Sequence, residues 1–338
     1  MRSDTILVLT LVGIGFAGAS PAWAEIRTIT ASGEYRMGDN DTRTDAKRLA
    51  LLDAKRSALE QVGTYLEGVS EVKNLQVTKD EIRTYTAGIV EVTEQATKDV
   101  MEGATHIVRV DVTCKIDSGG LAKQIDDLRK NEHAKEELLQ ARAEADQLRQ
   151  QVEAKNQELA ALKSKAGAEP LLQERQQALA KLDAQDLVIR AARPLNARGG
   201  FVEGEPLPAQ DRASMKAMLL QAIALDPTNV RAHVALGHVL QEEGDHEGAI
   251  REFRRALQIK PDLPRAHAGL GRALVSSGRR DEGERELRLY LATVKPTPAN
   301  QRNIERVQHR LRELEKQDDR RPNQKRQPPP RRPRRDDR

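Results

Sequence analysis

Apolar and polar residues alternate over residues 107–116, and the alternating apolar set is Val108, Val110, Val112, Cys114 and Ile116. A period of two predicts a β-strand with one buried and one exposed face. Residues 26–35 also have a β-rich composition, and shorter strands are predicted at 72–77 and from Ile89 to Val92. Cys114 lies on the apolar face, so we expect a small buried side chain; the alternative is a reactive thiol or an intermolecular disulfide.

After the first strand the apolar period changes to three or four residues, which predicts a helix of about 22 residues. Thr42, followed by Asp45, is suited to cap the first turn of this helix. The apolar stripe is rich in alanine, and its members are Ala46, Leu49, Ala50, Ala54, Ala58, Val62, Tyr65 and Leu66. Because small side chains let a helix lie close to a sheet, residues 25–117 are expected to form a small α/β domain.

Three segments of this region carry a resemblance: the ASGEY strand (Ala31 to Tyr35), the helix DAKRLALLDAKRSALEQVGTYLE and the strand HIVRVDVTCKI. Together they resemble the N-terminal domain of flagellar assembly protein T and related lipoprotein domains. The resemblance implies a periplasmic structural or assembly module, with no catalytic residues to carry over. The chain departs from the lipoprotein members because it has no cysteine near its N-terminus for a lipid anchor.

Residues 119–193 are rich in Leu, Ala, Glu, Gln, Lys and Arg, with apolar residues at alternating steps of three and four. This heptad spacing is typical of a coiled coil. Its apolar positions are Leu121, Ile125, Leu128, Leu138, Ala141, Ala145, Leu148, Val152, Leu159 and Leu162 and, after Pro170, Leu172, Leu179 and Leu182. We expect a stalk that forms a homodimer or homotrimer. The alternative is a helical hairpin within one chain that turns at residues 166–170, because the two halves have similar lengths.

Beyond a Gly/Pro-rich linker at residues 194–210, the chain repeats with a period of 34 residues within 211–316. The patterned positions are Leu236, Gly237, Gly244, Ala249, Phe253, Ala256 and Pro261 in the first unit, and Leu270, Gly271 and Gly278 in the second. This pattern resembles the tetratricopeptide repeat (TPR) family, whose units are stacked helix–turn–helix pairs. The resemblance implies that these residues pack the helices, and that Gly244 and Gly278 make the turns.

The flanks and the second unit depart from the pattern. Gly283, Leu287 and Tyr290 replace the expected Ala, aromatic and Ala, so we expect the second helix of that unit to pack less closely. Met215, Leu219 and Ala222 fit the second half of a degenerate repeat, and residues 300–316 are expected to form a charged capping helix. About three helix pairs are near the minimum for a stable stack.

In this family, positions 2, 5, 9 and 12 of each unit line a groove. Here those positions are Arg231, Val234, His238, Gln241, Arg265, Ala268, Arg272 and Val275. Arginines on one face predict a site for an acidic or extended peptide, held by bidentate contacts between guanidinium and carboxylate. The alternative is that they are ordinary solvated charges. His233 and His267 share one repeat position, and we expect them to pack rather than to bind a ligand.

Composition excludes several classes of protein. Aromatic residues are only 2% of the 338 residues, whereas charged residues are 32%. So few aromatics favour an elongated, mainly helical chain over one large core. A single cysteine rules out a Cys-based metal site, and the sequence has no GxxxxGK[ST], GxSxG or HExxH motif. We therefore expect a protein with no catalytic activity, no cofactor and no metal site.

The two ends of the chain carry separate signals. Residues 1–24 combine Arg2, an apolar run over 6–17 and Ala22-Trp23-Ala24, the pattern of a cleaved secretory signal; the alternative is a retained short anchor. We therefore expect export, in a bacterium to the periplasm. Residues 317–338 form a Pro/Arg-rich tail that is expected to be disordered. Because no aromatic residue interleaves its arginines, we expect no nucleic-acid partner.

These features predict a mainly α, multidomain protein with a small α/β N-terminal domain, a coiled-coil stalk, an α-solenoid of repeat helix pairs and a disordered basic tail. We expect a periplasmic scaffold or adaptor that oligomerises through the coiled coil and binds a partner protein or peptide through Arg231, Arg265 and Arg272. One alternative is a cell-envelope structural or tethering protein whose basic tail binds an anionic surface. Another is a flagellar or secretion assembly factor, which rests on the N-terminal resemblance.

Overall fold

The computed structural model describes residues 26–72, 90–103, 105–117, 132–162, 167–197, 206–297 and 300–319. The expected secretory signal lies outside these residues, as do the first three apolar positions of the expected coiled coil. Most of the expected tail also lies outside them. Its first three residues, however, belong to a helix that ends at Asp319, later than the expected capping helix.

A small antiparallel sheet is followed along the chain by a succession of helices. The strands are β1 (Ile26–Arg36), β2 (Glu91–Glu102) and β3 (Thr105–Asp117). The helices are α1 (Arg43–Val72), α4 (Glu132–Ala161), α5 (Ala168–Ala191), α6 (Arg193–Ala197), α7 (Ala209–Leu225), α8 (Val230–Glu242), α9 (His246–Ile259), α10 (Pro264–Ser276), α11 (Arg280–Thr293) and α12 (Gln301–Asp319). The expected mainly α fold class with a small α/β part is therefore confirmed.

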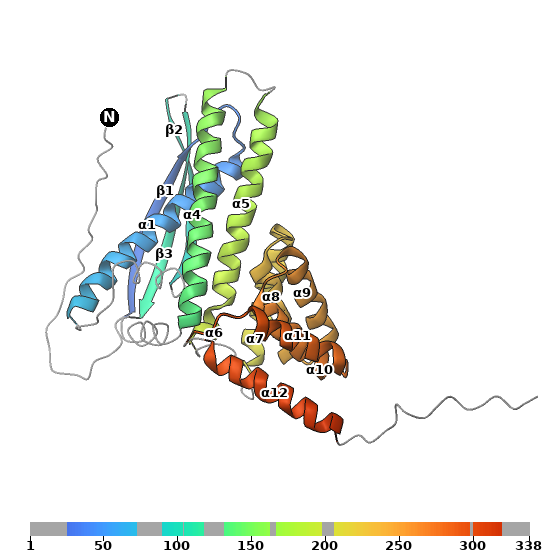
Figure 1. Ribbon diagram of the computed structural model, residues 1–338. Helices are drawn as coiled ribbons and strands as arrows, with labels where there is room; N and C mark the ends of the chain where they lie inside the picture. The colour runs from blue at the N-terminus through green and yellow to red at the C-terminus, as the bar shows by residue number, and fades with distance from the viewer. Residues whose placement is uncertain are drawn as a thin grey trace, which may run out of the picture.

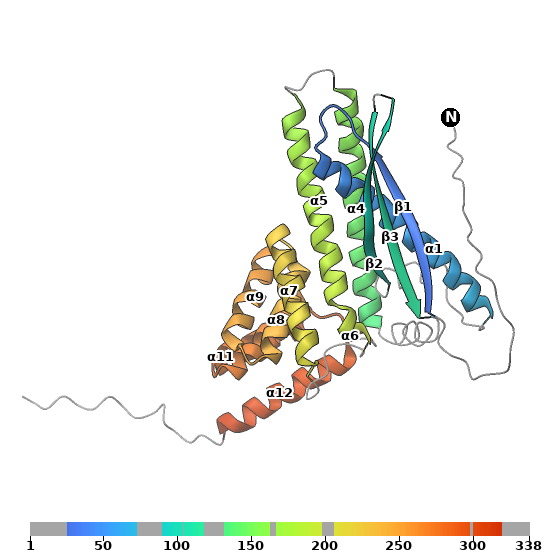
Figure 2. The ribbon, with the colours of Figure 1, turned by 180° about the vertical axis from the view of Figure 1, so that it is seen from behind.

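In Figure 1 the sheet and α1 lie together on one side of the molecule, and the long α4–α5 pair lies in the middle. The shorter repeat helices lie on the other side, with α12 below them. The view from behind in Figure 2 shows the same order. The repeat helices and the sheet therefore lie on opposite sides of the α4–α5 pair.

The sheet has the strand order β1-β3-β2, with both pairs antiparallel. α1 covers one face, where its alanine stripe packs against the alternating apolar residues of β3 in one core. The approach is close: a Cβ on Gly33 of β1 would lie 2.2 Å from the carbonyl oxygen of Ala50. Cys114 is fully buried in this core, as expected, and burial raises the pKa of its thiol.

The edges of this domain differ from the sequence prediction. α1 is 30 residues long and includes Val72, where a strand was expected to begin; that prediction is wrong at this residue, and residues 73–77 lie outside the described part. β2 starts at Glu91 and continues well past the expected Val92. The Thr42 cap is present: its hydroxyl accepts a hydrogen bond from the Asp45 backbone N–H at 3.1 Å.

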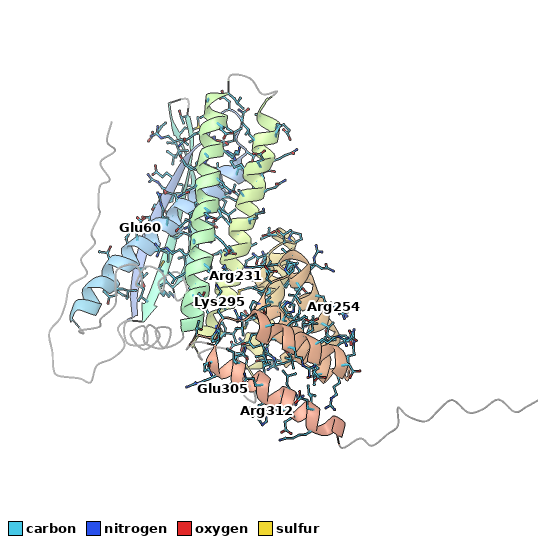
Figure 3. All side chains as sticks on the ribbon, viewed as in Figure 1. Glu60, Arg231, Arg254, Lys295, Glu305 and Arg312 are labelled. Atoms are coloured by element: carbon cyan, nitrogen blue, oxygen red, sulfur yellow. The ribbon has the colours of Figure 1, made fainter. Side chains whose placement is uncertain are left out.

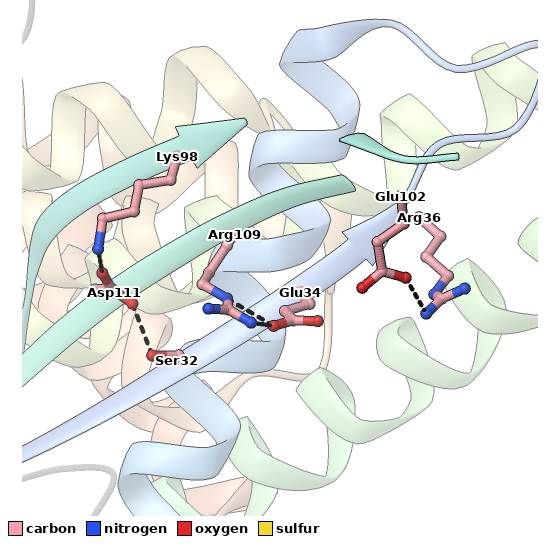
Figure 4. A network of polar contacts seen from close by, with 7 residues as sticks. All are labelled: Ser32, Glu34, Arg36, Lys98, Glu102, Arg109 and Asp111. Atoms are coloured by element: carbon pink, nitrogen blue, oxygen red, sulfur yellow. Dashed lines mark hydrogen bonds and ion pairs between the residues drawn. The ribbon is translucent and has the colours of Figure 1, made fainter. Parts of the chain in front are cut away.

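The other face of the sheet is covered by paired charges, as Figure 4 shows. Lys98 and Ser32 both bond the Asp111 carboxylate, at 3.1 and 2.7 Å. Further pairs on this face join Arg109 to Glu34 and Arg36 to Glu102. These partners come from different strands, and such cross-strand pairs stabilise their register.

The α4–α5 pair is a hairpin within one chain. The two helices pack against each other, and Ala145, Val152, Leu179 and Leu182 of the heptad pattern share one buried cluster. Lys155, which lies between the apolar positions Val152 and Leu159 of α4, pairs across the hairpin with Glu174 at 2.9 Å. The structure thus shows the hairpin alternative. Heptad residues that would carry self-association are used inside the chain, and the homo-oligomeric stalk has no support here.

The hairpin and α1 form one body, although the sequence suggested a separate domain and stalk. The cluster just described also contains Leu49 of α1. At its edge, the buried Arg175 of α5 donates to Asp41 at 2.7 Å and to Asn156 at 3.1 Å. Asp45 lies 3.5 Å away from the same guanidinium. Because an unpaired buried charge is strongly unfavourable, this ion pair fixes how the hairpin sits on the N-terminal domain.

α5 also belongs to the repeat stack. Its C-terminal half, with Leu187 and Ala191, shares a core with Met215 and Leu219 of α7. α7 was expected to be the second half of a degenerate repeat, and α5 serves as its first half. The segment expected as a separating linker includes the buried Leu207, which belongs to the same core.

We find no described helix whose length and apolar character would suit it to crossing a bilayer.

Candidate partner-binding face

Each repeat consists of two helices joined by a tight turn at glycine. Gly244, between α8 and α9, has a φ of 80°, and Gly278, between α10 and α11, has a φ of 85°. Glycine adopts this left-handed conformation without steric strain. The side chains of Asn229 and Asp245 cap α8 and α9 by accepting a backbone N–H bond from the first turn. The sequence therefore fixes both the start and the reversal of the first repeat.

Phe253 of α9 packs the two repeats together. Its side chain is fully buried, and a Cβ on Gly237 or on Gly269 would lie within 3.0 Å of its ring, at 2.9 and 2.4 Å. The other pattern residues surround these contacts. Buried in the stack are Leu236, Gly237, Ala249, Ala256, Leu270 and Gly271, whereas Gly244, Pro261 and Gly278 lie at exposed turns.

The expectation of looser packing in the second repeat is wrong. A Cβ on Gly283 of α11 would lie 2.7 Å from the carbonyl oxygen of Gly271 in α10. Leu287 and Tyr290 are fully or almost fully buried. The glycine in place of the usual alanine lets the two backbones approach closely, and the tyrosine is accommodated because α12 packs over it.

His233 and His267 make the same contacts in the two repeats. Each Nδ1 lies 2.7 Å from a glutamate of the following helix, Glu252 or Glu286. Each Nε2 lies 3.1 or 2.9 Å from the carbonyl oxygen of Pro227 or Pro261, respectively, at the end of the preceding unit. The two imidazoles therefore join successive units, which agrees with the packing role expected for this repeat position.

The groove residues of the first repeat are largely occupied within the chain. Arg231 forms a bidentate ion pair with Glu144 of α4, with both distances 3.1 Å. Burial lowers the pKa of Arg231, and the Glu144 charge opposes that effect. Val234 and His238 are buried, with His238 edge-on to Phe253 at a centroid distance of 5.0 Å, and Gln241 is partly exposed. Figure 3 shows Arg231 where the hairpin meets the repeats.

The groove residues of the second repeat face α12. Ala268 and Val275 pack with the apolar side of α12 in one cluster. Arg265 and Arg272 lie one turn before and one turn after Ala268 on the same side of α10, so they flank this contact. Burial and, to a smaller extent, the nearby positive charge of Arg272 together lower the pKa of Arg265 to about 10.

The eight predicted groove residues thus do not form one continuous site. Arg231 is held at the hairpin, whereas Arg265 and Arg272 lie on α10, on either side of Ala268, which packs with α12. The three buried residues, Val234, His238 and Ala268, contribute to packing rather than to an accessible face.

Sequence reasoning missed two contributors to this face. Glu144 belongs to the heptad region, and no local pattern indicates that it would reach the repeats. α12 was expected only as a charged cap, but the 34-residue period offers a signal. Counting 34 residues from the start of α10 at Pro264 gives 298, and α12 begins at Gln301.

Comparison with protein-family models gives two matches, both described as tetratricopeptide repeat, over residues 218–251 and 240–302. No curated protein matches the sequence significantly.

Several solved structures show partial likeness. The type III secretion translocator chaperone SycD of Yersinia enterocolitica is 17% identical, with 40% of this chain and 93% of that chain covered and a TM-score of 0.34. A CopN–Scc3 complex is 14% identical over 40% and 74% of the chains, with a TM-score of 0.31. MamA is 23% identical over 38% and 70%, with a TM-score of 0.28. Together, the period, the turns and the family matches identify residues 218–302 as a tetratricopeptide repeat module.

Proposed function

We propose that this chain is a non-catalytic adaptor whose repeat module captures a partner protein or peptide through α10, chiefly through Arg265 and Arg272. Tetratricopeptide repeats give the chain a role in protein–protein interaction. The observation that carries the finer proposal is the position of these two arginines on α10, one turn before and one turn after Ala268, which packs with α12. A partner carboxylate beside them would accept charge-assisted hydrogen bonds.

The contact between Arg231 and Glu144 supports the same chemistry. The glutamate uses both carboxylate oxygens, and the two guanidinium nitrogens lie 3.1 Å from them. This is the geometry expected for an acidic side chain of a partner. One arginine at this repeat position already binds a carboxylate within the chain, and Arg265 holds the same position in the next unit.

We place this adaptor in an exported compartment, the periplasm of a bacterium. The support is the sequence of residues 1–24, with its basic start, apolar run and Ala22-Trp23-Ala24. The test is fractionation of cells that express the full chain or a chain lacking residues 2–24. Release of the full chain by osmotic shock, with the shortened chain retained inside, is expected; equal retention of both would contradict export.

The binding proposal is tested by cross-linked capture from intact cells. The variant is Arg265→Gln/Arg272→Gln, and the matched control is Arg251→Gln/Arg255→Gln, two exposed arginines of α9. We expect one defined partner to be lost from the first variant and kept by the control, with unchanged circular dichroism for both. If all three chains capture the same proteins, Arg265 and Arg272 do not bind the partner.

A further inference from the structure

α12 follows the repeat register of the chain. Ile304 and Val307 lie 34 residues after Leu270 and Ala273, and all four side chains are buried. In α10, the first helix of its repeat, Leu270 and Ala273 are residues that pack on the preceding repeat. α12 therefore occupies the place of the first helix of a third repeat, although no helix follows it in the described residues.

Polar contacts fasten both ends of α12 to α11. Near the start of α12, the Asn303 amide donates to the Tyr290 hydroxyl at 3.0 Å. Near its end, Glu315 pairs with Arg288 at 3.4 Å, and the Leu314 carbonyl accepts a bond from Arg280 at the start of α11. α12 is thus fixed in rotation as well as in position, which determines where its remaining side chains lie.

The Asn303 side of α12 is the side nearest the arginines of α10. Ala268, which lies between Arg265 and Arg272 on α10, packs in one cluster with Tyr290 and the apolar side of α12. Burial raises the pKa of Tyr290, and the charges of Arg272 and Arg265 oppose that rise. Arg306 is one turn beyond Asn303, and Arg302 is one turn before Arg306. Arg302 and Arg306 are exposed, and neither has an ion-pair partner among the described residues.

We propose that Arg265, Arg272, Arg302 and Arg306 form one binding surface, the basic face, and that its occupant is an extended acidic segment of a partner protein. This inference rests on the proposed adaptor function and adds α12 to the site. In the repeat register, Arg306 is the equivalent of Arg272, so the basic position continues from one unit into the next.

The spacing on the basic face fits an extended chain. Arg302 and Arg306 are four residues apart on a helix, which separates them by about 6 Å along its axis. Alternate side chains of an extended peptide are about 7 Å apart and point the same way. A segment with acidic residues at alternate positions could therefore present one carboxylate to each of these arginines. Its remaining carboxylates could continue to Arg272 and Arg265.

An anionic membrane fits the basic face less well. The apolar residues of α12 are buried against α10 and α11, so this helix has no apolar side left to enter a bilayer. Arg265 is also partly buried. A flat surface would meet the exposed arginines of α12 but not Arg265, whereas a single extended peptide could reach both helices.

The test uses the full chain and a fluorescein-labelled peptide in which aspartate alternates with alanine, with an asparagine version as its control. Binding is measured by fluorescence anisotropy in about 150 mM salt, where exposed charges more than about 8 Å apart are largely screened. The variant is Arg302→Glu/Arg306→Glu. The matched control is Arg251→Glu/Arg255→Glu, which reverses two exposed arginines with the same spacing on α9.

We expect the α12 variant to bind the aspartate peptide at least about tenfold more weakly and the α9 control to change by less than about twofold. An equal loss in both variants would show charge attraction without a site and would overturn the inference. Binding to phosphatidylglycerol vesicles that depends on Arg302 and Arg306, without peptide binding, would assign the face to a membrane and also overturn it.

The same α12 variant, added to the capture experiment, separates this inference from the proposed function. Capture retained by Arg302→Glu/Arg306→Glu but lost by Arg265→Gln/Arg272→Gln would leave the adaptor function standing and remove α12 from the site. Capture retained by both variants would reject both. Loss in both, with normal circular dichroism and an intact α9 control, is the result that we expect.

Discussion

Arg231 and Arg265 hold the same position in two successive repeats, yet they meet opposite charges. Arg231 faces a carboxylate, Glu144, which α4 brings from outside the repeats. Arg265 lies close enough to a second guanidinium, that of Arg272, for its charge to lower the pKa of Arg265, on a helix that packs against α12. The repeat pattern sets the direction in which a side chain leaves its helix. The charge that it meets comes from Glu144 of α4 for Arg231 and from Arg272 of the same helix for Arg265.

The largest effect is expected from removing what the two repeats share. Phe253→Ala deletes a fully buried ring packed against both α8 and α10. We expect a loss of about 3–5 kcal/mol in the free energy of unfolding, because the cavity cannot fully collapse. Urea denaturation followed by circular dichroism measures it. Phe253→Leu should lose clearly less, and equal losses for the two variants would contradict a role based on ring volume.

A smaller effect should be nearly equal in the two repeats. His233→Ala and His267→Ala each remove a ring that bonds a glutamate and a carbonyl. We expect each to lower the free energy of unfolding by about 1–3 kcal/mol, since the glutamate and the carbonyl lose their hydrogen-bond partner.

His233 is the more buried of the two rings, with a side-chain exposure of 6% against 13%. Its variant should therefore be the less stable. If only one of the two substitutions lowered the free energy of unfolding, the two imidazoles would not have equivalent roles in joining successive units.

Alkaline pH should affect the hairpin side through Tyr35. Burial and the Asp41 carboxylate raise the pKa of Tyr35 from 10.0 to about 12. Between these values the folded chain holds a proton that the unfolded chain has lost, so stability should fall as pH rises from about 10 to about 12 and be unaffected by this group below that range.

Tyr35→Phe should make this part of the pH profile flatter. Tyr290→Phe gives the comparison on the α12 side, because burial also raises the pKa of Tyr290. Thermal unfolding across this range measures both variants. An unchanged profile in Tyr35→Phe would show that this phenol does not titrate with folding.

The smallest effect on stability is expected from freeing Arg231. Glu144→Gln removes the exposed partner of this arginine, and Glu136→Gln, at another exposed position of the same helix, is the control. We expect a change below about 1 kcal/mol in the free energy of unfolding. The variant should nevertheless bind the alternating aspartate peptide more tightly than the control. If it does not, Arg231 is a structural ion pair and takes no part in recognition.

The predictable parts of the molecule are those set by local pattern. The alternation in β3, the Thr42 cap and the glycine turns at Gly244 and Gly278 follow from residue type and spacing, and the structure contains them. β2 was largely missed because its sequence, EVTEQATKDVME, is mostly polar and its exposed side is held by cross-strand charges.

The less predictable parts depend on contacts between distant segments. A heptad pattern predicts that a helix packs against another helix, but not whether that helix belongs to the same chain. The same residues were therefore compatible with an oligomeric stalk or with a hairpin. The local sequence does not distinguish Arg175 from other charged helix residues, because its partner, Asp41, is 134 positions away. For the candidate face, the period located α8 and α10. Only the fold could bring Glu144 to Arg231 or place α12 beside Arg265.

α5 packs both on α1 of the N-terminal domain and on α7 of the repeats, and this constrains the order in which the chain can fold. As the chain is made from its N-terminus, Asp41 lacks its ion-pair partner until Arg175 follows, and α7 then packs on an α5 that is already present. Contacts over so long a stretch form slowly. A chain interrupted before residue 168 would lack the hairpin's second helix, and one that began at residue 211 would lack the first partner of α7. The N-terminal half can therefore become resistant to proteolysis once α5 has emerged, and the repeats only after α7 has packed on it.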